Sequence, residues 1–172
     1  MTPPDHFARL GLPRRFVVDA AALERAYLAH SRAVHPDYHA AGAAGELAAS
    51  TELSAAVNEA YNTLREPFAR ADYLLVLLGG PPASQVKGVE PAFLAEVMDL
   101  RERVEDADQH AAVRAEIAER TAVFEARIAD GYARVEALSD DAPERAAHLL
   151  AVRRALNALK TLRSLARTLP DD

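Results

Sequence analysis

Three histidines and one aspartate lie close together in the first quarter of the chain: His30, His35, Asp37 and His39. Histidines four residues apart bind metal ions when a helix places them on one face. Pro36 excludes that helix, because proline removes a backbone donor and pushes the preceding residue out of helical geometry. We therefore expect no metal here. We interpret His30 as a core-edge residue with a hydrogen-bond partner and His39 as a solvated loop residue.

Other signatures of catalysis are missing from the sequence. It contains no Gly-x-Ser-x-Gly, no His-Glu-x-x-His and no glycine-rich phosphate loop. Its 172 residues include no cysteine, which excludes disulfides, thiol nucleophiles and thiolate metal ligands. The carboxylate pairs of the C-terminal half are typical of solvated helix faces. We expect a protein that is not an enzyme and that binds no cofactor.

Charge and hydropathy limit the partners and the location. The formal net charge of -6 argues against a general nucleic-acid or anionic-membrane binder. The N-terminal segment "MTPPDHFARLG" has no basic region followed by an apolar one, so no signal peptide is expected. The longest apolar run, which starts at Tyr73, is too short to span a bilayer. We expect a cytoplasmic monomer.

The elements that position the His-Pro-Asp segment are all predicted to be helices. Apolar residues recur at spacings of three and four, and no stretch reads as a strand. Asp5 and Asp19 are predicted N-caps, and Asp141 with Glu144 forms an Asp-x-x-Glu helix start. The expected helices cover residues 5–12, 19–35, 46–65, 67–78, 91–106, 109–138 and 141–169.

Residues 79–90 are rich in glycine and proline and lack a period, which indicates a linker between two units. The expected first domain, residues 1–78, is a helical hairpin with flanking short helices. The expected second domain, residues 91–172, is an antiparallel three-helix bundle, because its apolar spacing is near 3.5. The predicted fold class is all-α.

The His-Pro-Asp break is a candidate recognition loop. An exposed loop on a rigid scaffold is where recognition residues tend to lie. On the preceding helix, Arg25 and Arg32 are seven residues apart and share a face, so a partner of mixed charge would fit. In the alternative reading, Asp37 merely caps the loop.

Two longer stretches carry a family resemblance. The opening "DHFARLGLP" and the helix–His-Pro-Asp–helix order resemble the J domain, which stimulates ATP hydrolysis by chaperones of the DnaK class. The segment "AAVNEAYNTLREPFARADYLL" and the later "AFLAEVMDLRERVEDA" closely resemble the HscB family of iron–sulfur cluster co-chaperones. The matching residues in the first of these segments are Asn58, Ala60, Tyr61, Thr63, Leu64, Pro67, Arg70, Ala71, Tyr73, Leu74 and Leu75.

The resemblance implies two docking sites and no bond-breaking chemistry. The J domain would dock on an ATPase of the HscA type and stimulate it, and the bundle would hold an iron–sulfur scaffold protein of the IscU type. The implied ATPase-binding residues are His35, Pro36, Asp37, Arg25 and Arg32. The implied scaffold-binding residues are Leu94, Ala95, Met98, Asp99 and Glu102.

The helix that starts at Pro91 has two apolar stripes. Phe93, Val97, Leu100 and Val104 form one stripe, which we assign to the bundle core. Leu94 and Met98 form a second stripe, which must be buried elsewhere or bind a partner. The alternative is that both stripes are internal to the bundle.

Two small residues depart from the family pattern. Ala95 and Ala155 stand where relatives often carry a larger apolar side chain and an aromatic one, respectively. This predicts a weaker scaffold site, or a partner with compensating bulk. It also keeps open a second reading, in which the protein is a J-domain adaptor for a different client. A purely structural helical protein, in which His-Pro-Asp is only a turn, is the third reading.

Substitutions in the His-Pro-Asp triplet separate a docking role from a structural one. His35→Gln or Asp37→Asn should abolish stimulation of the chaperone ATPase, because these residues act by contact, while circular dichroism and the melting temperature stay unchanged. A large loss of fold in either variant would show that the loop is structural.

Overall fold

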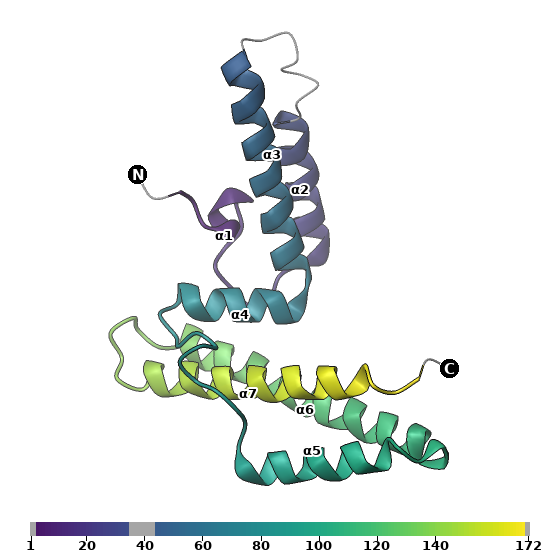
Figure 1. Ribbon diagram of the computed structural model, residues 1–172. Helices are drawn as coiled ribbons and strands as arrows, with labels where there is room; N and C mark the ends of the chain where they lie inside the picture. Colours follow the sequence, from purple (N-terminus) through teal and green to yellow (C-terminus); the bar gives the residue numbers. More distant parts are fainter. Residues whose placement is uncertain (1–2, 35–43, 171–172) are drawn as a thin grey trace. The chain divides into compact units, whose positions relative to one another are not determined.

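The computed structural model describes residues 3–34 and 44–170, and every regular element within those ranges is helical, as predicted (Figure 1). The chain divides into two compact units, residues 1–74 and 75–172. The elements are α1 (His6–Arg9), α2 (Ala20–Ala33), α3 (Ala44–Arg65), α4 (Pro67–Leu77), α5 (Pro91–Arg103), the 3-10 helix η2 (Ala107–Gln109), α6 (His110–Glu136) and α7 (Arg145–Ala166).

The N-terminal unit is built around the pair α2 and α3, which lie side by side (Figure 1). Helix α1 packs against α3 and buries Phe7 completely. The predicted N-caps are confirmed: Asp5 accepts hydrogen bonds from two amides of α1, and Asp19 accepts one from Ala21. These caps satisfy amides that a helix start leaves without partners.

Helix α4 joins this core through the residues of the family-like segment. The hydroxyl of Tyr73 accepts a hydrogen bond from the amide of His6 at 3.0 Å, and the two rings stack at 4.2 Å. The guanidinium of Arg70 donates to the carbonyl of Leu64 at 2.6 Å and lies 5.4 Å from the ring of Phe16. Much of the family-like segment therefore helps to build the core of the N-terminal unit.

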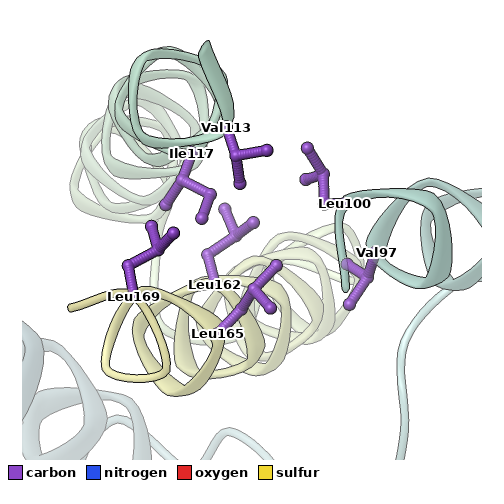
Figure 2. Packing of buried hydrophobic residues seen from close by; sticks show 7 residues of the cluster. All are labelled: Val97, Leu100, Val113, Ile117, Leu162, Leu165 and Leu169. Carbon is purple, nitrogen blue, oxygen red and sulfur yellow. The ribbon is translucent and has the colours of Figure 1, made fainter. Parts of the chain in front are cut away.

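The C-terminal unit consists of the hairpin of α6 and α7 with α5 packed against it (Figure 1). Their shared core draws on all three helices, whose side chains point toward one another in Figure 2. Phe93, Val104 and Phe124 pack around this cluster. The cluster consists of Val97, Leu100, Val113, Ile117, Leu162, Leu165 and Leu169.

The segment predicted as a linker is held on α7. The buried Arg153 donates from Nε to the carbonyl of Pro81 at 2.9 Å. The amide of Asn157 donates to the carbonyls of Val86 at 2.8 Å and Gly88 at 3.1 Å. These bonds satisfy carbonyls of a segment without regular structure, so this part of the chain follows a fixed path along α7.

Three details of the sequence prediction are wrong. The last helix starts at Arg145 and not near Asp141, because the carboxylate of Asp141 bonds to Ser139 in the preceding turn. His30 is exposed and not a core-edge residue, since α2 buries only Leu23. Helix α5 also ends at Arg103, before the expected residue 106, because Asp106 caps the next turn.

The stacked pair of His6 and Tyr73 predicts a pH effect. Burial lowers the pKa of His6 below its ordinary value of 6.5, so the folded state favours the neutral ring. This stabilisation is complete above pH 6.5 and is lost as the pH falls through the folded-state pKa. Urea unfolding followed by tyrosine near-UV circular dichroism should therefore show a declining midpoint below pH 6.5. His6→Phe keeps an aromatic ring that can stack on Tyr73 but cannot ionise, so this variant should show a smaller decline. An equal decline in that variant would contradict the assignment.

Candidate functional site: two exposed helix faces

The triplet His35, Pro36 and Asp37 lies outside the described residues, as does His39. The structure instead describes what holds the end of α2 next to it. The hydroxyl of Ser50, on α3, donates to the carbonyl of Val34 at 2.7 Å, and Ser50 is buried. This bond satisfies one of the carbonyls that the end of a helix leaves without partners. It also fixes the last described residue before the triplet against α3.

The outer face of α2 combines charge with an apolar side chain. Arg25 and Arg32 are both exposed, and their seven-residue spacing places them on the same face of α2. Leu28 lies between them in the sequence, at helical spacings of three and four, and is 42% exposed. The three residues therefore share one solvent-facing surface. It offers a partner two cations around an apolar contact.

The inner side of α2 is fixed to α3 by tyrosines. The rings of Tyr27 and Tyr61 stack with centroids 4.2 Å apart. The hydroxyl of Tyr27 donates to Oδ1 of Asn58 at 3.0 Å, and that of Tyr61 donates to the carboxylate of Glu24. This last bond raises the pKa of Tyr61. These contacts hold α2 in place on α3, while the outer face of α2 stays exposed.

Helix α5 carries the second exposed face. Val97 and Leu100 are buried in the bundle core, whereas Leu94 and Met98 are 49% and 48% exposed. The alternative in which both apolar stripes are internal is therefore wrong. Ala95 is exposed beside them. Two large apolar side chains on one solvent-facing stripe form a small contact surface for a partner.

The acidic residues beside this stripe differ in their environments. Asp99 forms an ion pair with Arg103 at 3.3 Å. Arg103 also binds Glu116 at 2.6 Å, and this bond lowers the pKa of the Glu116 carboxyl. Glu102 is exposed and forms no ion pair with any residue that the structure describes. Its carboxylate is the one at this edge without a partner in the bundle.

A groove of about 830 Å³ lies among α5, α6 and α7. Ala155 lines it, but Leu94 and Met98 do not. The two departures from the family pattern therefore lie on different surfaces: Ala95 is on the exposed face of α5, and Ala155 is in the groove.

Neither a metal site nor a membrane-spanning helix occurs within residues 3–34 and 44–170, which the structure describes. No group of three or more histidine, aspartate or glutamate side chains there could hold a metal ion. Among the same residues, no helix combines the length and the apolar character needed to cross a membrane.

Sequence reasoning missed Ser50 and gave Leu28 no role. A serine within a long helix carries no signal for a bond to a carbonyl sixteen positions away. Leu28 could have been found from its spacing to Arg25 and Arg32, because residues three and four apart on a helix are neighbours.

Ser50→Ala should loosen the end of α2. The variant leaves the Val34 carbonyl without its donor, which should lower the free energy of unfolding by about 1–2 kcal/mol. Urea unfolding measures this loss, and amide hydrogen exchange should quicken at Val34. Ser54→Ala, one turn further along α3, is the control. Equal protection at Val34 in the wild type and Ser50→Ala would contradict the assigned role.

The chain resembles known proteins in both sequence and structure. Residues 89–164 match the family model described as the HSCB C-terminal oligomerisation domain. A co-chaperone protein HscB homolog from Bordetella petrii is 42% identical over 118 residues, which cover 68% of this chain and 69% of the relative. The homolog from Bordetella pertussis is 39% identical over 122 residues, covering 68% and 72% of the two chains.

Two solved structures share the fold. The chaperone HscB from Vibrio cholerae matches with a TM-score of 0.75 at 27% identity, covering 95% of this chain and 94% of that one. The human co-chaperone protein HscB matches with a TM-score of 0.82 at 23% identity, covering 97% and 81%. They confirm the predicted all-α fold of a J domain followed by a helical bundle. The sequence relatives show that the chain belongs to the HscB family of co-chaperones.

Proposed function

We propose that this co-chaperone stimulates an ATPase of the DnaK class, of the HscA type, and delivers an iron–sulfur scaffold protein of the IscU type to it. The observation that carries the delivery half is the exposure of Leu94 and Met98, on a helix whose other stripe is packed in the core. In this proposal the protein is a cytoplasmic monomer that holds no metal of its own.

The ATPase would dock on the J domain, residues 1–78. His35, Pro36 and Asp37 make the decisive contact, and the α2 face of Arg25, Leu28 and Arg32 extends it. The support for this docking surface is the exposure of those three side chains and the bracing of α2 against α3. These contacts stimulate hydrolysis only if they differ between the two states of the ATPase. The chain itself breaks no bond.

The scaffold would dock on α5 of the bundle, residues 91–172. Leu94 and Met98 supply the apolar contact. The small side chain of Ala95 allows the scaffold to approach α5 closely. Asp99 and Glu102 lie at the edge, where Glu102 has the carboxylate that is not paired within the described bundle. A partner with a cation beside an apolar patch would complement this surface.

Joining the two sites in one chain raises the concentration of the scaffold at the ATPase. A tether of this kind strengthens the combined complex by roughly a hundredfold or more without any new contact. The segment 79–90 is the proposed linker, and its bonds to Arg153 and Asn157 shorten the part that can move freely.

The second candidate is a J-domain adaptor for a different client. The small side chain of Ala95 favours it, because the α5 face is flatter than the resemblance leads one to expect.

Single-turnover ATP hydrolysis by an HscA-type chaperone tests the proposal. This protein should accelerate hydrolysis, an IscU-type scaffold should increase the acceleration further, and Asp37→Asn should remove both effects. Leu94→Ala or Met98→Ala should weaken only the scaffold response, by about 1–2 kcal/mol each.

The matched control is Leu53→Ala, because Leu53 is 48% exposed and lies on α3, far in sequence from the α5 face. It should leave the scaffold response unchanged. Acceleration that does not change when the scaffold is added would favour the adaptor for another client. No acceleration at all would contradict the proposed function.

A further inference from the structure

Met98 carries the only sulfur atom of the chain apart from that of Met1, because the sequence has two methionines and no cysteine. Hydroperoxides oxidise thioethers, and the cysteine thiolates that usually compete for such oxidants are missing from this chain. The side chain of Met98 is 48% exposed on α5. Beyond the N-terminal residue, Sδ of Met98 is therefore the one sulfur that such an oxidant can attack.

The same sulfur lies in the contact surface of α5. Leu94, one turn earlier on the same stripe, is 49% exposed, and the neighbouring Ala95 has only a methyl group as its side chain. This face therefore has two large apolar side chains, and Met98 is one of them. A change in the polarity of Met98 alters a main part of what the face offers to a partner.

The packing of the bundle does not depend on Met98. Its neighbours Val97 and Leu100 hold α5 in the core, where they are 5% and 1% exposed. Met98 does not belong to that cluster of buried side chains. A chemical change at its sulfur should therefore alter the exposed face of α5 and leave the core behind it intact.

We propose that Met98 is a reversible oxidation site for hydroperoxides, and that its sulfoxide weakens the proposed docking of the scaffold. The inference rests on the proposed function, because the contact that is lost belongs to that docking site. It makes delivery of the scaffold sensitive to oxidants through a single side chain of the co-chaperone.

The reaction transfers one oxygen atom. A lone pair of the thioether sulfur attacks one oxygen of hydrogen peroxide and the O–O bond breaks. The departing hydroxide takes the proton of the transferred oxygen and leaves as water. The sulfur is oxidised by two electrons and the peroxide is reduced by two. Methionine sulfoxide reductases reverse the change, with two thiols that form a disulfide while the oxygen leaves as water.

A sulfoxide is a poor substitute for a thioether in an apolar contact. Its oxygen is a hydrogen-bond acceptor, and burial of such a group without a donor costs free energy. The oxidised side chain is also chiral and polar, which disrupts contacts built on methionine. The dissociation constant of the scaffold should therefore rise roughly tenfold.

Treatment of the full chain with hydrogen peroxide, followed by desalting, tests the proposal. Peptide mass mapping should find one added oxygen at Met98, while circular dichroism and the melting temperature stay unchanged. The treated chain is then titrated with an IscU-type scaffold that has never met the oxidant, and its dissociation constant should rise roughly tenfold. Acceleration of an HscA-type ATPase without scaffold should stay as before. Methionine sulfoxide reductases for both epimers, with dithiothreitol, should restore the affinity.

Two variants of the full chain assign the effect to Met98. Met98→Leu keeps an apolar side chain and retains Met1 but has no sulfur on α5. Its scaffold affinity before treatment is its own reference, and peroxide should leave that value unchanged. Met98→Gln places a polar side chain of similar length at the site. Without any oxidant, it should bind the scaffold as weakly as the oxidised chain.

Three results would overturn the proposal and leave the proposed function intact. The first is a folded chain in which peroxide converts Met1 but not Met98. The second is a chain oxidised at Met98 that binds the scaffold as tightly as the untreated one. The third is an equal loss of affinity in treated Met98→Leu. An untreated chain that does not bind the scaffold would instead contradict the proposed function, and this inference with it.

Discussion

The packing of one stripe of α5 into the bundle core is the constraint on which the functional surfaces depend. Val97 and Leu100 meet leucines of α7 and apolar residues of α6 in a single cluster (Figure 2). Because side chains on a helix recur every 3.6 residues, this contact fixes the rotation of α5 about its axis. The rotation turns Leu94 and Met98 outward and places Phe93 at the groove. One packing interaction thus sets both surfaces of the C-terminal unit.

The N-terminal unit uses a different device for the same purpose. Its α2 face is small and mostly polar, so the stability of α2 comes from its other side, where Leu23 is buried and Tyr27 stacks on Tyr61. The bond from Ser50 to the Val34 carbonyl extends that support to the last described turn before the His-Pro-Asp triplet. A recognition loop gains affinity when its ends are held in place, because less conformational entropy is lost on binding.

The sequence was most informative where local chemistry decides the structure. The caps at Asp5 and Asp19 and the two-stripe pattern of α5 follow from residue type and spacing, and the structure confirms them. It failed where competing contacts leave no signal in residue type and spacing. Asp141 looked like a helix cap but is bound in the preceding turn, and His30 has the spacing of the buried Leu23 and the stacked Tyr27 but is itself exposed. The groove was unpredictable because it depends on how α5 lies against two other helices.

The central claim is that the ATPase-docking and scaffold-docking surfaces must act in the same chain. A mixture of two full-length variants, each of which lacks one of the two surfaces, tests it most directly: Asp37→Asn, which keeps the α5 face, and Leu94→Ala with Met98→Ala, which keeps the triplet. We predict that the mixture shows no scaffold-dependent acceleration of single-turnover ATP hydrolysis beyond that of the two variants measured separately. Recovery of wild-type acceleration by the mixture would contradict the claim, because the two surfaces would then work from different molecules.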